Sequence, residues 1–315
     1  MKARQLVNVV MRRYGMGMGS SHYSFSRIKP EEQLFFPSTK EAQASSTGEM
    51  ETISRMPAPS LSLVRSAVLV ERLDFLPFYE RKILCVDAQG RTVLYDADAH
   101  ADAGLLHPLP SLRGPKGPNP ILLLPSLDQE ALWTRGGPTS CTSWTSDPST
   151  AGKAGVAPAP PPPPPPRPRA HFPPSPNPCF EAGGGRLPFA GRAHRVPELD
   201  NLWFGIASAW PSDLCAMDLY PLCGLRPEAP RLAYSWGDLS LPDDWEMMDC
   251  SMVYLGGGRF CVAKIFEFCL GDDRKGMGVI SGLEVVRQGE PSKLVMVKHK
   301  SKLYKFTRGE IQCIL

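Results

Sequence analysis

The stretch Lys82–Asp96 reads KILCVDAQGRTVLYD and carries the clearest structural signal in this chain of 315 residues. Its two ends, Lys82–Asp87 and Thr92–Asp96, are rich in Val, Leu, Ile and Tyr, and the turn residues Ala-Gln-Gly-Arg lie between them. Strand-forming residues on both sides of a short turn with glycine are typical of a β-hairpin. We therefore expect two antiparallel strands here.

Weaker copies of this unit lie at Leu202–Asp218 and at Ser251–Glu267. In the second copy the turn is Gly256-Gly-Gly-Arg259, and a hairpin explains these glycines better than a phosphate-binding loop, which would end in Gly-Lys-Ser/Thr. A lone hairpin cannot cover its own apolar face, so repeated hairpins favour the stacked blades of a β-propeller. The fold class that we predict is all-β, a partial or open β-propeller-like repeat of short antiparallel hairpins.

The two ends of the chain carry further strand signals. Leu6–Val10 and Tyr23–Arg27 favour a first hairpin around Gly15–Gly19, although the absence of acidic residues before Glu31 would also suit an organelle transit peptide. Lys40–Met56 predicts a loop with a short helix at most. Near the C-terminus we expect strands at 279–286, 293–297, 302–306 and 310–315, the last at a sheet edge, with a turn at 298–301.

A different composition separates these strand-rich parts. Residues 134–186 contain no Leu, Ile, Met or Tyr, and Pro160–Pro166 is an unbroken proline run. A segment that cannot bury apolar surface cannot offset its ordering entropy, so we expect it to be disordered. The predicted organisation is N-terminal hairpins over residues 1–133, a disordered proline-rich linker over 134–186, and further blades of the same body over 187–315. An out-of-frame or mis-spliced stretch of a GC-rich gene would have a similar composition.

Large apolar side chains in the repeated units form the predicted core. Neighbouring residues of a strand point to opposite faces, so burying both requires blades that are covered on each side. The residues that we expect to be mostly buried are Trp203, Phe204, Val253, Tyr254, Phe260, Val262, Ile265 and Phe266.

Composition argues against several classes of protein. The net charge of +3 is too balanced to predict a nucleic-acid or membrane partner, and no apolar run approaches the length of a membrane span. The nine cysteines form no C-x-x-C pair, and several lie in apolar runs such as Phe260–Ala263. They are typical of buried, reduced thiols in a cytoplasmic or nuclear protein rather than of disulfides or a zinc site.

No constellation of residues predicts catalysis. The six histidines have no metal-ligand spacing, and the pairs Asp243-Asp244 and Asp272-Asp273 have no companion His, Lys or metal motif. A nucleophile elbow is absent as well. We therefore predict no enzyme activity, no catalytic or metal-binding residues and no cofactor.

One candidate for partner binding is the proline run. Pro160, Pro166, Arg167 and Arg169 lie in a segment that should adopt polyproline II. Such a segment could dock in the aromatic groove of an SH3, WW or profilin type of domain. A stiff spacer is the commoner role of a proline run.

The other candidate is basic. Residues 293–308 contain six Lys or Arg and no acid, interleaved with aromatic residues, and Lys298, Lys300 and Lys302 are the candidate contacts. A nucleic-acid surface would have this pattern, because cations neutralise phosphates while aromatic rings stack on bases. A lysine-protected edge strand is commoner and is our prediction, so we regard nucleic acid as an unlikely partner.

Several strings of this sequence are long enough to compare with known families. They are LFFPST (34–39), LCVDAQGRTVLYDAD (84–98), PKGPNP (115–120), LPFAGRAHRVPELDNLWFGIAS (187–208), MVYLGGGRFCVAKIFE (252–267), and GLEVVR (282–287) with KHKSKLYKF (298–306). Together they resemble an uncharacterised family of grass proteins, domain of unknown function 1668. The resemblance implies a kelch-like or F-box-associated type of β-propeller and no catalytic residues. The chain departs from the family in its middle, where residues 134–186 stand in place of further strands.

These observations favour a non-enzymatic module that binds another protein, with adaptor function as an analogy from the fold alone. One alternative is a propeller that binds a sugar or small ligand and has enzymatic activity, which needs convergent polar groups at the central channel. A second alternative is a degenerate or mis-spliced gene product without a stable fold.

Overall fold

The computed structural model describes seventeen segments of the chain. They are residues 4–14, 21–45, 50–53, 56–65, 73–77, 82–87, 89–96, 106–111, 120–124, 143–145, 189–209, 212–219, 231–239, 245–270, 273–289, 293–306 and 309–315.

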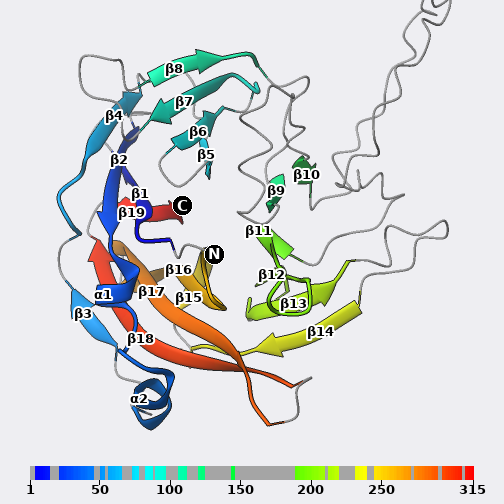
Figure 1. Ribbon diagram of the computed structural model, residues 1–315. Coiled ribbons are helices and arrows are strands. Elements are labelled where there is room, and N and C mark those ends of the chain that lie inside the picture. The colour runs from blue at the N-terminus through cyan, green and yellow to red at the C-terminus, as the bar shows by residue number, and fades with distance from the viewer. Residues whose placement is uncertain are drawn as a thin grey trace, which may run out of the picture.

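Four sheets, which we call blades I to IV, are arranged around a centre as a four-bladed β-propeller (Figure 1). Blade I has the strand order β19 (Gly309–Ile314), β1 (Val7–Tyr14), β2 (Ser21–Ile28) and β4 (Leu61–Arg65). Blade II consists of β5 (Asp74–Pro77), β6 (Lys82–Val86), β7 (Thr92–Asp96) and β8 (Leu106–Leu109). The predicted all-β, propeller-like fold is confirmed, whereas its kelch-like subtype stays a prediction.

The other two blades are larger. Blade III has the order β10 (Ser143–Thr145), β9 (Pro120–Leu124), β11 (Phe189–Val196), β12 (Leu202–Ala207), β13 (Leu214–Asp218) and β14 (Arg231–Trp236). Blade IV has the order β15 (Glu246–Gly256), β16 (Arg259–Leu270), β17 (Asp273–Arg287), β18 (Leu294–Phe306) and β3 (Glu51–Ile53). Only β9 with β11 and β3 with β18 pair in parallel among the described strands.

The locally encoded hairpins form as predicted. The pairs β1–β2, β6–β7, β12–β13 and β15–β16 are all antiparallel. In the last hairpin Gly256, Gly257 and Gly258 have φ values of 95°, 60° and 75°. Residues with a Cβ rarely adopt these values, so the three glycines serve the turn, as expected.

Two predictions for the C-terminal part are wrong. Residues 298–301 form no turn, because they lie within β18 and pair with β17, with Ser301 opposite Ser281 and Lys298 opposite Leu283. The lysine-protected edge strand is also wrong, since β18 lies between β17 and β3. By contrast, β19 is an edge strand as predicted, at the inner end of blade I.

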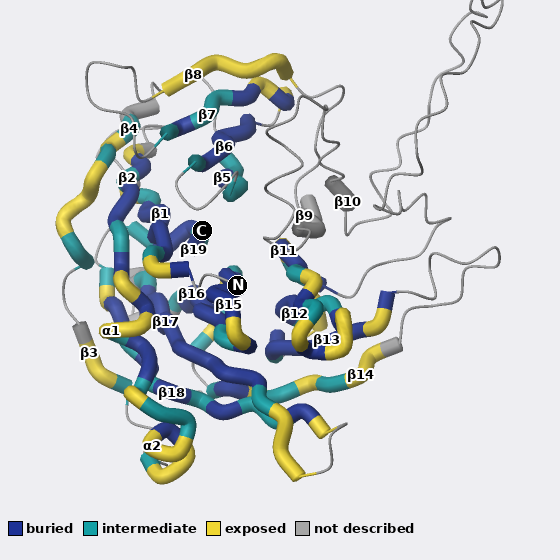
Figure 2. The backbone as a smooth tube through the Cα atoms, viewed as in Figure 1, coloured by how far each residue is buried: buried dark blue, intermediate teal, exposed yellow. Residues whose placement is uncertain are grey.

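Blade IV is buried on both faces, which explains its nearly continuous apolar sequence. Phe260 and Val262 of β16 pack toward blade III, whereas Cys261, Ala263 and Ile265 pack toward blade I. The large apolar residues of the predicted core are buried, and only Trp203 is half-buried. Figure 2 shows the same contrast between the buried inner strands and the exposed outer strand β8.

The two ends of the chain meet in blade I. The C-terminal strand β19 pairs with the N-terminal strand β1, with Ile314 opposite Val9. Near this pairing Arg192 of blade III is 9% exposed, and its guanidinium donates to the carbonyl oxygens of Ile314 in blade I at 3.0 Å and Phe75 in blade II at 3.1 Å. One buried side chain therefore ties three blades together at the centre.

Residues 29–60, which we call the strap, leave blade I after β2 and return to it at β4. On the way they form the short helices α1 (Pro30–Gln33) and α2 (Thr39–Ala44) and the strand β3, which joins blade IV. Ser38 caps α2, because its Oγ accepts a hydrogen bond from the backbone N–H of Glu41 at 3.3 Å. The expected short helix is thus present, whereas β3 was not predicted.

Most of the proline-rich segment lies outside the described residues. Between β8 of blade II and β11 the described strands are β9 and β10, which join blade III, and β10 is the only described part of 134–186. The predicted disorder of this segment therefore stays a prediction. Pro160, Pro166, Arg167 and Arg169 also lie outside the described residues.

Candidate functional site

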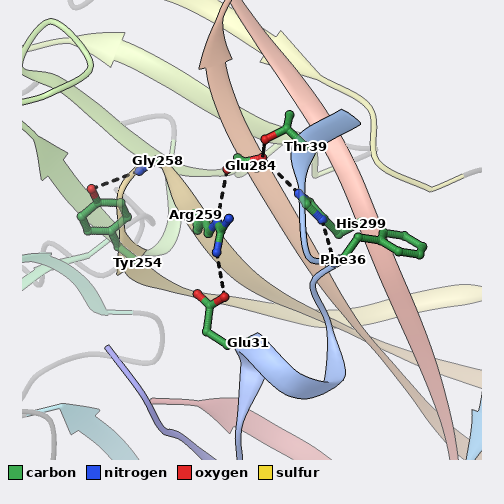
Figure 3. Close-up of polar contacts among 8 residues, drawn as sticks. All are labelled: Glu31, Phe36, Thr39, Tyr254, Gly258, Arg259, Glu284 and His299. Atoms are coloured by element: carbon green, nitrogen blue, oxygen red, sulfur yellow. Dashed lines mark hydrogen bonds and ion pairs between the residues drawn. The ribbon is translucent and has the colours of Figure 1, made fainter. Parts of the chain in front are cut away.

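The polar contacts that dock the strap on blade IV converge on Glu284 of β17 (Figure 3). Its Oε2 accepts a hydrogen bond from Thr39 Oγ1 at 2.8 Å and lies 3.2 Å from His299 Nε2. Its Oε1 accepts from Arg259 Nε at 3.1 Å. Burial alone would raise the pKa of the Glu284 carboxyl, but the hydrogen bonds from Thr39, Arg259 and His299 outweigh it and lower the pKa. Glu284 is therefore an ionised anchor.

His299 of β18 links this anchor to the strap backbone. Its Nδ1 accepts a hydrogen bond from the N–H of Phe36 at 3.1 Å, so the ring proton lies on Nε2, which donates to Glu284. Burial lowers the pKa of His299 and outweighs the opposite effect of Glu284. A neutral ring with this tautomer satisfies both partners.

Arg259 of β16 contacts the strap from the other side. Its NH1 lies 2.7 Å from Glu31 Oε2, and its guanidinium carbon lies 5.2 Å from the centre of the Phe35 ring. Phe35 and Leu34 are themselves buried in the core between blades IV and I. The first half of the strap is therefore firmly held.

A close backbone approach completes the docking. The carbonyl oxygen of Leu34 accepts a hydrogen bond from the N–H of Lys300 at 2.9 Å. A Cβ at Gly282 would lie 2.5 Å from this oxygen, and the register of β17 shifts between Ser281 and Leu283. Gly282 thus leaves the space that the strap occupies.

This network lacks the geometry of nucleophilic catalysis. In a triad the base contacts the nucleophile and is oriented by a third group. Here Thr39 and His299 both donate to the same carboxylate oxygen of Glu284. The contacts fit a docking role, with the hydroxyl and the imidazole as donors to one anion.

The structure separates the three candidate lysines. Lys300 Nζ lies 4.9 Å above the Phe36 ring, and Lys302 Nζ lies 3.5 Å from Glu51 Oε2 of β3, so both contact the strap. Burial lowers the pKa of Lys298, which also lies close enough to Asp238 and Lys264 for their charges to affect that pKa. Two of the predicted contacts therefore belong to one surface, and the third belongs to the seam between blades III and IV.

That seam contains a buried ion pair. Lys264 of β16 and Asp238, which follows β14, are in close contact and have side chains 2% and 1% exposed. The second carboxylate oxygen of Asp238 is buried without a hydrogen-bond partner in the structure. Nearby, burial raises the pKa of Asp213, and the negative charge of Asp238 adds to the effect.

Another buried titratable group lies near the centre. The Nε2 atom of His194 is buried without a hydrogen-bond partner. Burial, together with the positive charges of Arg192 and Arg4, lowers the pKa of His194 to about 3. The ring is therefore neutral at physiological pH.

Sequence reasoning missed Glu284 and Lys264 as site residues, although a signal was present. Each is a charged residue inside an otherwise apolar strand, in the strings GLEVVR and FCVAKIF. A charge at such a position is buried and needs a partner. The partners Thr39 and Asp238 lie far away in the chain and could not be identified.

Within the described segments, no three His, Cys, Asp or Glu side chains gather as a group that could hold a metal ion. The helices of these segments have four and six residues, far fewer than the ~20 that a membrane span requires.

Comparison with known proteins gives one match. No curated protein and no solved structure matches this chain. The family model described as protein of unknown function (DUF1668) matches residues 4–174 and 181–304, and the match includes most of the proline-rich segment. With most of its length covered, the chain belongs to the DUF1668 family.

Proposed function

We propose that this protein is a non-enzymatic protein-interaction module that binds a partner at the outer edge of blade IV. The observation that carries the proposal is the group of lysines on β18, with Lys302 and Lys305 on opposite faces of the blade. The side-chain nitrogens of Lys300 and Lys302 contact the strap, and Lys305 is exposed. A rigid blade whose outer part carries lysines on both faces is suited to an acidic partner, because complementary charge guides association and orientation.

Two features support binding over catalysis. The polar contacts of Glu284 and Arg192 hold elements of the fold together. The propeller also offers several outer strands whose side chains are exposed, and β8 is exposed along its whole length. Exposed strand edges and scaffolded loops are common sites of protein recognition.

Photo-crosslinking tests the proposal. A benzoylphenylalanine placed at Lys305 should capture a discrete partner in cells, and the purified partner should bind the unmodified chain. The matched control carries the same group at Arg13, an exposed position of blade I. Adducts that are identical from both positions, or no adduct at Lys305, would refute the proposed interaction site.

A further inference from the structure

We propose that β3 is a built-in occupant of a site for acidic, extended partner segments on β18, and that such a segment replaces β3 when it binds. This inference rests on the proposed interaction function and assigns it a class of partner and a form of regulation. The partner segment would pair with β18 as an added strand. In this mode of recognition, backbone hydrogen bonds supply affinity and neighbouring side chains supply specificity.

The pairing of β3 with β18 is short and peripheral. Glu51, Thr52 and Ile53 pair in parallel with Lys302, Leu303 and Tyr304. Both Glu51 and Thr52 are exposed. The ion pair of Glu51 with Lys302 spans 3.5 Å, and the Glu51 side chain is 65% exposed whereas that of Lys302 is 13% exposed. A short strand held in this way is easily exchanged.

The rest of the strap need not move when β3 leaves. Leu34 is 0% exposed and Phe35 is 3% exposed, and both belong to the core between blades IV and I. Glu284 and His299 hold the strap at Thr39 and Phe36. These anchors precede β3 in the chain, so its release leaves Leu34 and Phe35 in the core, although it also frees the partly buried Met50 and Met56 on either side of β3.

Charge selects the replacing segment. β3 brings Glu51 to Lys302, while Lys300 is covered by the Phe36 ring and Lys305 is exposed. A partner strand in the place of β3 that carried several acidic side chains would meet Lys302 and Lys305. β3 itself offers one carboxylate, so an acidic segment of greater length has the advantage in charge and in backbone pairing.

Release of β3 should therefore strengthen binding. When a site is free for only a fraction of the time, the apparent dissociation constant is the intrinsic constant divided by that fraction. If β3 is in place about nine-tenths of the time, its removal makes binding roughly tenfold tighter. The direction of this effect distinguishes a displaceable occupant from a structural strand.

The test measures fluorescence anisotropy of a labelled peptide Glu-Glu-Met-Glu-Thr-Ile-Glu-Glu with the full chain. Thr52→Pro removes a backbone N–H from β3 and should raise affinity about tenfold, whereas Thr52→Val retains the N–H and should leave affinity unchanged. Lys302→Glu should weaken binding at least tenfold, and Lys82→Glu on blade II should have no such effect. Melting temperatures of all variants verify that each chain is folded.

Four results would overturn the inference. One is a peptide that does not bind, and another is an affinity that Thr52→Pro lowers or leaves unchanged. The third is that a labelled twenty-nucleotide RNA binds as tightly as the peptide and that Lys302→Glu abolishes this RNA binding. The site would then recognise phosphate groups rather than acidic peptide side chains. A partner captured at Lys305 that binds wild type and Thr52→Pro equally would refute the role of β3 and leave the interaction function intact.

Discussion

Truncation of Asp238 to Ala should be among the most damaging single changes in this protein. The substitution removes the carboxylate beside Lys264, whose side chain is 2% exposed, and leaves an ammonium inside the seam between blades III and IV. Removal of one partner of a buried pair typically costs about 3–5 kcal/mol, because the remaining charge stays desolvated. Asp213 is near enough for its pKa to respond to Lys264, so it can compensate in part. We therefore expect Asp238→Ala to lower the free energy of unfolding by about 3 kcal/mol, the lower end of that range.

Urea denaturation of the full chain measures this loss of stability. Two further variants serve as an exposed-pair control and as a test of recovery. Asp96→Ala removes the partner of Lys82 in a bridge of 3.3 Å whose side chains are 41% and 19% exposed, and should cost about 0–1 kcal/mol. Lys264→Met in the Asp238→Ala background removes the buried, unpaired ammonium and should recover most of the lost stability.

If Asp238→Ala costs no more than Asp96→Ala, the seam is hydrated and the buried ion pair does not stabilise the fold as expected. If Lys264→Met gives no recovery of stability, the cost of Asp238→Ala comes from altered packing rather than from the unpaired ammonium. A double-mutant cycle of wild type, Asp238→Ala, Lys264→Met and the double variant measures the coupling between the two side chains directly.

Three further predictions concern stability and organisation. Phe260→Ala should lower the free energy of unfolding by about 3–5 kcal/mol, because the ring is 0% exposed and packs between blades III and IV; an unchanged melting temperature would contradict the buried-strand assignment. The pKa of His194 is lowered to about 3, so the unfolded chain binds a proton below pH 6.5 that the folded chain does not. Stability should thus fall by about 2 kcal/mol between pH 6.5 and 5, and His194→Asn should reduce that slope in denaturation curves at several pH values. Limited proteolysis should cut within residues 134–186 and leave a stable fragment that begins near Leu187; protection there with cuts elsewhere would argue against a disordered linker.

The elements that the sequence predicted are those whose pairing is local. In β6–β7 and β15–β16 the turn residues and both strands lie within one short stretch of sequence. The composition and the positions of the glycines were therefore sufficient to predict these hairpins. The burial of Val253 and Tyr254 on opposite faces also followed from strand geometry once stacked blades were assumed.

The features that the sequence did not predict depend on contacts with distant parts of the chain. The lysines and serine of 298–301 have the composition of a turn, but they extend β18 because β17 supplies partners on one side and the strap on the other. The partner of β19 is β1, at the opposite end of the sequence, and the partner of Glu284 is Thr39. Local propensity carries no information about such contacts, and tertiary pairing overrides it.

The ring closure and the proposed site are mechanically separate, which bears on how a partner could act. Blade I is completed by β19, and its junction with blade IV also contains Leu34 and Phe35 of the strap. The exchangeable strand β3 lies at the outer edge of blade IV, beyond these anchors. Binding there would compete with β3, of which Glu51 and Thr52 are exposed, and with the partly buried Met50 and Met56 that flank it. It would not compete with Leu34, Phe35 and β19, which close the propeller. An interaction surface on a rigid blade, covered by a weakly held strand, can therefore respond to partner concentration without unfolding the domain.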